Sequence, residues 1–315
     1  MPKVSVGLPV YNGDRYLKQV LECLTSQTFA DFEVIISDNA STDETQRICE
    51  EHCQRDKRFR YFRNVKNLGL APNHNRVFEL SSGQYFKWAS HDDLFAPDYV
   101  EKCVDVLDSN LEIVDCFSKV KVIDQNGKHI EDYDPLPATS SDKPQVRFSN
   151  LILNPDGRAI QFLGLMRVDY LKKTRLVGPY PSSDEIFIAH MALFGKFYEI
   201  PEHLYYYRSH EKQSTKGVLA SERSRVLVFD TSTKNRIVLL KWMYVKDCWF
   251  AINRSPITSY QRLTCLIHLL RWFCKPENFR SVMKDLLLAI HQRIPLFPGL
   301  HREALDAARK SHHYE

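Results

Sequence analysis

Two adjacent aspartates, Asp92 and Asp93, follow a short apolar run, residues 84–88, that is typical of a β-strand. Pro97 follows shortly after, in a position suited to the first turn of a helix. Mg²⁺ and Mn²⁺ prefer carboxylate oxygens and are often shared between one or two carboxylates and the phosphates of a substrate. The pair therefore predicts a hard-cation site, with helix capping or a turn as the structural alternative.

Further along the chain, two other groups could do chemistry. Asp184 and Glu185 come directly before an apolar segment, residues 186–193, that predicts a buried helix. Carboxylates in a first turn are favoured by the helix dipole, which is a sufficient structural reason for both. His210 follows a tyrosine-rich strand, and a neutral imidazole can ligate Mn²⁺, although an exposed loop histidine is an equal alternative.

The elements that must position Asp92 alternate between strand and helix. Apolar runs predict strands over 4–10, 32–37, 59–63 and 84–88, with helices over 14–24, 42–54 and 72–83 between them. Ser41 and Glu44 have the spacing of a capping box for the second helix. This alternation predicts an α/β fold with a parallel sheet and helices on both faces.

In such sheets, ligands bind at the carboxyl ends of the strands. Three polar loops are predicted to meet there: Pro9 to Asn12, Asp38 with Asn39, and Ser90 to Asp93. A tyrosine can stack on a base, an aspartate can accept from a base N–H or a ribose hydroxyl, and a bound cation can neutralise a pyrophosphate. The set suits a nucleotide diphosphate.

The usual phosphate-binding loops are missing from the sequence. No G-x-G-x-x-G follows the first predicted strand, and no G-x-x-x-x-G-K-[ST] occurs. Without a glycine-rich loop, a cation has to carry the phosphate charge. This argues against a nicotinamide dehydrogenase and against a P-loop kinase.

Four sequence blocks, taken together, resemble the family 2 nucleotide-sugar glycosyltransferases of the GT-A fold. They are VGLPVYN (6–12), SDNASTD (37–43), NLG (67–69) and SHDD (90–93), and their order and spacing match the family over roughly residues 3–110. The resemblance implies a Rossmann-like mixed sheet flanked by helices. It also implies an inverting transferase that uses a nucleotide-diphosphate sugar, with a UDP-sugar favoured, and Mn²⁺ or Mg²⁺.

The resemblance assigns roles to individual residues. It implies that Asp92 ligates the cation, with Asp93 and His210 as further ligands, although Ser90 replaces the first acidic residue of the family's metal motif. It implies that Asp184, or else Glu185, is the base that deprotonates the acceptor hydroxyl. The nucleotide-binding positions that it implies are Pro9, Tyr11, Asn12, Asp38, Asn67, Asn75, His91 and Asp92.

The second half of the chain is predicted to complete the transferase and then to become helical. Strands are expected over 113–122 and 159–166, and residues 131–147 form a predicted loop that is either a lid or a plain surface connection. The expected domains are residues 1–216, divided into a nucleotide-binding half (1–110) and an acceptor and catalytic half (111–216), and a helical extension (217–315). Its helices are expected over 218–252, 258–274 and 276–294.

Bulk composition limits the partners and the compartment. A net charge of +4 is too small to indicate nucleic acid binding. The eight cysteines contain no C-x-x-C, and a strand is predicted almost from Met1, so the expected location is the cytoplasm without a signal peptide. Residues 258–294 carry Trp, Phe and Leu among basic residues. They either contact the membrane interface or pack on the transferase domain or on a second copy.

Other functions are compatible with parts of this pattern. Nucleotidyl transfer would need a glycine-rich, basic loop after the first strand, which residues 10–13 do not provide. A sugar-nucleotide-binding or scaffold protein without catalysis is the non-enzymatic alternative, and Ser90 is the residue that supports it. The leading prediction is glycosyl transfer to a glycan or a lipid-linked acceptor, in polysaccharide or glycolipid assembly.

Overall fold

The computed structural model describes residues 1–133, 139–154, 159–210, 222–234 and 238–293. Its strands are β1 (Val4–Val10), β2 (Phe32–Asp38), β3 (Phe59–Arg63), β4 (Tyr85–Trp88), β5 (Leu94–Phe95), β6 (Ile113–Ile123), β7 (His129–Tyr133), β8 (Leu165–Arg167) and β9 (Lys196–Arg208). Its helices are α1 (Asp14–Thr25), α2 (Thr45–Arg55), α3 (Leu70–Glu79), α4 (Tyr99–Ser109), α5 (Pro144–Leu153), α6 (Val168–Leu171), α7 (Ser183–Phe194), α8 (Glu222–Phe229), α9 (Leu240–Arg254), α10 (Ser259–Phe273) and α11 (Pro276–Arg293), with short 3-10 helices η1 (Ile160–Leu163) and η2 (Thr231–Thr233).

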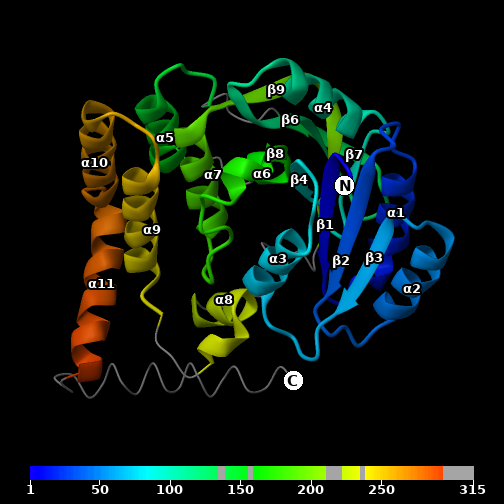
Figure 1. The fold of residues 1–315 in the computed structure, drawn as a ribbon. Helices are drawn as coiled ribbons and strands as arrows, with labels where there is room; N and C mark the ends of the chain where they lie inside the picture. The colour runs from blue at the N-terminus through cyan, green and yellow to red at the C-terminus, as the bar shows by residue number, and fades with distance from the viewer. Residues whose placement is uncertain (134–138, 155–158, 211–221, 235–237, 294–315) are drawn as a thin grey trace.

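The described strands form one mixed sheet. β3, β2, β1 and β4 are parallel neighbours in that order. β8 pairs antiparallel with both β4 and β6, and β6 then pairs parallel with β9. Helices α1 and α2 lie on one side of the parallel strands and α3 on the other (Figure 1). This confirms the predicted mixed α/β sheet flanked by helices, and it places the four predicted N-terminal strands correctly.

β1 is the central parallel strand, and all of its residues are buried, which explains its nearly continuous apolar sequence. Pro9 lies in this strand although it has no N–H. Backbone groups alternate in direction, and the carbonyl of Gly7 accepts from Ala89 on the β4 side. Pro9 therefore also faces β4, beyond Trp88, the last β4 residue paired with β1, so the sheet loses no hydrogen bond there.

Several local predictions were wrong. α2 begins at Thr45 without a side-chain cap, because the Ser41 hydroxyl accepts a hydrogen bond from the backbone N–H of Asn12 instead. Residues 160–163 form η1 rather than part of a strand. The expected loop over 131–147 contains the end of β7 and the start of α5, and residues 134–138 within it lie outside the described residues. The expected helix over 218–252 is divided into α8, η2 and α9 where it is described.

The C-terminal helices share a hydrophobic core with α5 and α7. The buried members of this second core are Phe148, Ile152, Tyr180, Ile186, Ala189, Leu193, Tyr244, Cys248, Ala251, Ile252, Ile257, Cys265, Leu269, Trp272 and Val282. The opposite side of α7, including Phe187 and Met191, belongs to the larger core under the sheet. α7 is therefore buried on all sides, which explains its uniformly apolar sequence.

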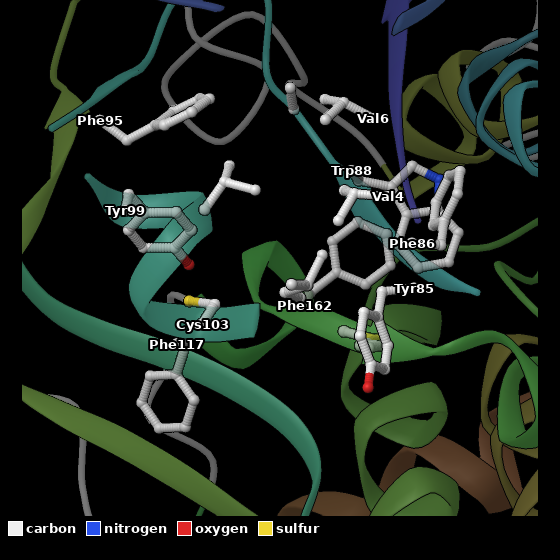
Figure 2. Close-up of a cluster of buried hydrophobic side chains, with 14 of the residues drawn as sticks. Val4, Val6, Tyr85, Phe86, Trp88, Phe95, Tyr99, Cys103, Phe117 and Phe162 are labelled. Carbon is white, nitrogen blue, oxygen red and sulfur yellow. The ribbon is translucent and has the colours of Figure 1, made fainter. Parts of the chain in front are cut away.

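An aromatic cluster joins the end of β4 to α7. The ring of Trp88 stacks on Phe162 of η1, with centroids 4.6 Å apart, and meets the edge of Phe187 at 5.4 Å. Phe162 and Phe187 also touch each other at 5.6 Å. Figure 2 shows Trp88 and Phe162 beside Phe86, next to the β1 valines. Each such pair contributes about 0.5–1.5 kcal/mol of stabilisation beyond that from the area it buries. The cluster therefore holds β4 and the start of α7 at a fixed separation.

Among the described helices, none is long and apolar enough to cross a bilayer.

His190 of α7 makes the stability of the shared core sensitive to acid. It is 3% exposed, and burial, with a smaller effect from Arg175, lowers its pKa to about 4. The folded protein keeps the ring neutral, whereas in the unfolded chain the ring takes up a proton below the ordinary histidine pKa of about 6.5. The free energy of unfolding is therefore unaffected by this ring above about pH 6.5 and decreases as the pH falls towards 4.

We predict that His190→Phe removes up to roughly 3 kcal/mol of the decrease in unfolding free energy that acid causes. Urea unfolding of both proteins at pH 7.5, 5.5 and 4.5 measures this difference, and equal losses in the two proteins would contradict it.

Candidate functional site

The three polar loops predicted to meet do lie at one edge of the sheet. Val10 pairs with Asp38, and the N–H of Asn39 donates to the carbonyl of Val10 at 2.8 Å. Asn12 connects the loop after β1 to the loop after β2, because its side-chain oxygen accepts a hydrogen bond from the N–H of Thr42 at 2.9 Å. A Cβ atom on Gly13 would lie 2.9 Å from the ring of His91, so the loop after β4 packs directly against the loop after β1.

Asp92 is the charged centre of this edge. It is buried, and one of its oxygens, Oδ2, accepts from Nε2 of His210 at 2.8 Å, while the other, Oδ1, accepts from the hydroxyl of Ser90. Burial favours the neutral acid. The effect of burial is outweighed by the hydrogen bond from His210, by the nearby His91 and by the hydrogen bond from Ser90. Together they lower the pKa of Asp92 to about 2. The carboxylate is therefore ionised at neutral pH.

Asp93 faces the closing strand β9. Its Oδ2 accepts from the Tyr205 hydroxyl at 2.9 Å, and its Oδ1 accepts from the backbone N–H of Arg208 at 2.7 Å. Burial, and then the neighbouring charge of Asp92, raise the pKa of Asp93 well above its usual range. The two adjacent aspartates are thus in different environments: Asp92 is ionised beside a histidine, and Asp93 joins β4 to β9.

Arg208, at the end of β9, is almost fully buried and connects four segments. Its Nε donates to the backbone carbonyl of Asp92 at 2.7 Å, and its Nη2 donates to the Gln19 side chain at 3.1 Å. Its guanidinium lies over the ring of Tyr16, 4.5 Å from the centroid, and also reaches the carbonyls of the β6–β7 turn. A planar group with several donors suits this role better than lysine would. These contacts fix the position of Arg208 and therefore of His210, which follows it two residues later.

The predicted cation ligands are only partly brought together. In the described part of the chain, no group of three or more histidine, cysteine or carboxylate side chains is arranged to hold a metal ion. Asp92 offers a carboxylate, and the His210 ring, whose Nε2 donates to that carboxylate, keeps its Nδ1 buried without a hydrogen-bond partner. Cations that also bind substrate phosphates take one or two protein ligands, so this pair fits such a site. Asp93 as a ligand stays a prediction.

The predicted base-binding residues differ in accessibility. Tyr11 is 44% exposed at the end of β1. Asp38 is fully buried, with its oxygens accepting from the Ser41 N–H at 2.8 Å and from the Tyr61 hydroxyl at 2.6 Å, and Arg63 lies 3.5 Å away. In this conformation Asp38 fixes the loop that follows β2. Whether it also contacts a base stays a prediction.

A buried network of amide side chains supports the loop around Asn67, and the sequence did not reveal it. Asn39 donates to the Asn67 side chain at 2.9 Å and accepts from Asn64 at 2.9 Å. Asn64 and Ser37 in turn both donate to the side-chain oxygen of Asn73, at 3.0 and 2.8 Å. The only available signal was the number of asparagines near strand ends, where turns alone would explain them.

Gly69 has a positive φ of 96°, and a Cβ atom there would lie 2.7 Å from backbone atoms of residues 229 and 230. The hydroxyl of Thr231 donates to the carbonyl of Asn67 at 3.0 Å. The end of α8 and the start of η2 therefore rest on the same loop. A glycine is required here both for the backbone conformation and for the close approach.

Asn75 lies on α3 and binds the chain that leads to α7. Its side-chain nitrogen donates to the carbonyl of Val177, and its oxygen accepts from the N–H of Val177, both at 3.0 Å. The described structure thus gives Asn75 a positioning contact. Its predicted contact with a nucleotide stays a prediction.

Asp184 and Glu185 lie in the first turn of α7, as predicted. The residue before this helix, Ser182, has a positive φ of 65°, and the hydroxyl of Ser183 donates to the carbonyl of Gly178 at 2.9 Å, so a tight turn sets the start of the helix. Burial mainly, with a contribution from Glu185, raises the pKa of Tyr244 on α9. Glu185 therefore lies near Tyr244 of α9. The assignment of the base to Asp184, with Glu185 as the alternative, stays a prediction.

Carboxylates lie where the parallel strands of this mixed sheet end, which is the arrangement expected for the GT-A fold. Residues 5–175, more than half of the chain, match the family described as Glycosyl transferase family 2. The chain belongs to this family.

Two sequence relatives cover part of the chain. An uncharacterized glycosyltransferase of Methanocaldococcus jannaschii is 33% identical over 136 residues, which are 42% of this chain and 47% of that protein. Chondroitin synthase of Escherichia coli is 34% identical over 143 residues, which are 45% of this chain and 21% of that protein. The match therefore spans less than half of the length of either relative.

Two solved structures share the fold over most of the chain. Residues 1–349 of S. aureus TarS, in complex with UDP-GlcNAc, align with a TM-score of 0.60 and 18% identity, covering 90% of this chain and 79% of that one. The mannosyltransferase PcManGT of Pyrobaculum calidifontis, in complex with GDP-Man and Mn²⁺, aligns with a TM-score of 0.52 and 14% identity, covering 98% and 80%. At these identities the likeness establishes the fold.

Arg208 offers a direct test of how the site is held. We predict that Arg208→Lys lowers the free energy of unfolding by about 3 kcal/mol, because the charge-assisted hydrogen bonds to the buried carbonyl of Asp92 and to the Gln19 side chain are lost while the charge stays buried. Arg15→Lys is the matched control: Arg15 is exposed and should change stability by less than about 0.5 kcal/mol. Urea unfolding measures both, and similar values for the two variants would rule out the proposed role of Arg208.

Proposed function

We propose that this glycosyltransferase moves a sugar from a nucleotide-diphosphate donor to an acceptor hydroxyl with inversion, and that it needs Mn²⁺ or Mg²⁺. The observation that carries the proposal is the pairing of ionised Asp92 with His210 where β4 ends, beside the loops that follow β1 and β2. The complexes of two structures that share the fold, with UDP-GlcNAc and with GDP-Man and Mn²⁺, support it. We favour a UDP-sugar as the donor.

The donor would lie across the carboxyl ends of β1, β2 and β4. The exposed ring of Tyr11 is available to stack on a base, and the loop held by Asn12 and Asp38 offers polar groups to the nucleoside. The amide network under Asn67 supports the neighbouring loop through hydrogen bonds within the protein. A preformed site of this kind avoids part of the ordering cost of binding.

Asp92 and His210 are the residues that would hold the cation. When bound, the cation supplies Lewis-acid stabilisation of the negative charge that develops on the diphosphate. The protein's own contribution is to keep Asp92 ionised and to hold His210 beside it, through Ser90 on one side and Arg208 on the other. Water is largely excluded, because Asp92, Asp93 and Arg208 are all buried.

Asp184 is the proposed general base. A carboxylate oxygen of Asp184 would take the proton of the acceptor hydroxyl. The acceptor oxygen would bond to the anomeric carbon as the bond from this carbon to the diphosphate breaks. The acceptor attacks the face of the sugar opposite the diphosphate, so the configuration inverts. The Trp88–Phe162–Phe187 cluster fixes the first turn of α7 relative to β4, as this mechanism requires.

We propose that residues 1–216 carry the transfer chemistry and that residues 217–315 form a supporting extension, because α9 and α10 pack on α7 and α5. The acceptor would be a glycan or a lipid-linked sugar, on the cytoplasmic side of polysaccharide or glycolipid assembly.

The cation proposal is tested by nucleotide-dependent thermal stabilisation. We predict that one nucleotide diphosphate stabilises the protein with Mn²⁺ but not with a chelator, by about 2.7 kcal/mol when its concentration is 100 times its Kd. Asp92→Asn should abolish this difference, because it removes the charged ligand. Asp105→Asn, on an exposed face of α4, is the matched control and should retain it. Stabilisation of Asp92→Asn equal to that of the parent protein would refute the assignment. No stabilisation of the parent protein by any nucleotide would favour the non-catalytic alternative.

The base proposal is tested by separating binding from transfer. We predict that Asp184→Asn retains donor binding, measured by the same stabilisation, but lowers the rate of transfer by roughly 10²–10⁴-fold. Glu185→Gln changes the adjacent carboxylate on the same turn and should lower the rate far less. A larger loss in Glu185→Gln than in Asp184→Asn would move the base to Glu185.

A further inference from the structure

Two C-terminal helices expose rows of large apolar side chains. On α10 the row contains Tyr260, Leu263, Ile267 and Leu270, with Leu263 58% and Leu270 60% exposed. On α11 the row contains Phe279, Met283, Leu287 and Ile290. Together with Trp242 and Trp249 of α9, these are ten of the seventeen large hydrophobic residues that are exposed in the described chain. We call the eight residues of α10 and α11 the apolar face.

Both rows lie on helix faces that do not enter the second core. The inward residues of α10, including Cys265, Leu269 and Trp272, belong to the second core, and so does Val282 of α11. The exposed rows therefore point away from α9 and α5. Figure 1 shows α10 and α11 one after the other along the edge of the molecule farthest from the parallel strands, with α9 on their inner side. The rings of Phe273 and Phe279, 5.7 Å apart, connect the two helices.

The charge of the chain is concentrated in the same helices. Residues 240–293 contain nine Lys and Arg and three Asp and Glu, which is a net charge of +6. The whole chain carries +4, so the remaining residues together carry −2. Arg271 and Arg280 are exposed cations on α10 and α11, next to the apolar rows, and Lys246 and Arg254 are exposed on α9.

We infer that the apolar face of α10 and α11 docks on an anionic lipid bilayer, with both helices lying in the interface. Apolar rows between exposed cations are the pattern of helices that bury one face at the boundary between headgroups and acyl chains. Each nearby Lys or Arg adds attraction to anionic lipid, whereas two copies of a segment with a charge of +6 would repel each other across a shared face. The charge therefore selects the bilayer over a second copy. The inference does not depend on the donor proposed above.

The test is co-sedimentation of the full chain with vesicles of phosphatidylcholine, with and without phosphatidylglycerol. We expect binding to the anionic vesicles that weakens as salt is raised, because surface charge is screened. Leu263→Gln with Leu270→Gln should lower the partition coefficient by roughly tenfold or more. The matched control is Leu111→Gln with Ile130→Gln, whose side chains are 80% and 54% exposed on the transferase half, and it should bind as the parent does.

A second variant tests the charge separately. Arg271→Gln with Arg280→Gln should weaken binding to anionic vesicles only, while Lys18→Gln with Lys57→Gln, on the transferase half, should not. Equal binding by the parent and the leucine variant, or no sedimentation of the parent, would overturn the inference. A parent that is dimeric in light scattering and becomes monomeric in the leucine variant, without vesicle binding, would assign the face to a second copy. Donor stabilisation by nucleotides is measured in the same samples, so a failure of the proposed function would be recognised separately.

Discussion

The candidate site depends on one buried connection, between the loop after β4 and the end of β9. Asp93 accepts from the Tyr205 hydroxyl and from the backbone of Arg208, and the Arg208 side chain returns to the carbonyl of Asp92. Burying these groups is costly unless every polar atom finds a partner, so the arrangement is stable only as a complete set. The connection also places His210, two residues after Arg208, where its Nε2 donates to Asp92 and favours the ionised carboxylate.

A second constraint acts through α7. One side of this helix belongs to the core under the sheet and the other to the core shared with α5 and the C-terminal helices. The first turn, which carries Asp184 and Glu185, is thus positioned by both halves of the molecule. The C-terminal helices are part of the framework that sets the distance between the two groups of carboxylates, whatever else they bind.

The sequence was sufficient for much of the fold and for the placement of Asp92, because continuous apolar runs and turn residues determine parallel strands locally. It placed a strand over 159–166, of which only residues 165 and 166 belong to the antiparallel β8, since so short a segment has no periodicity. It also assigned Ser41 to a helix cap, although the Ser41 hydroxyl accepts a hydrogen bond from the backbone N–H of Asn12, in a loop distant in sequence. The roles of Tyr205 and Arg208 were missed for the same reason: their partners lie more than a hundred residues away. The proposed base and nucleotide contacts stay predictions.

That long separation has a consequence for how the protein folds. β1 to β4 and the helices between them can form once the first part of the chain has been synthesised, because the pairing partners of β1, β2 and β3 all lie within residues 4–88. Asp93 and Arg208 are 115 residues apart, so the surroundings of Asp92 cannot be completed until β9 has entered the sheet beside β6 and β5. Contacts of such high contact order form late and slowly. The surroundings of Asp92 are therefore completed late, and a chain in which β9 has not yet paired has the parallel strands β1 to β4 without this charged centre.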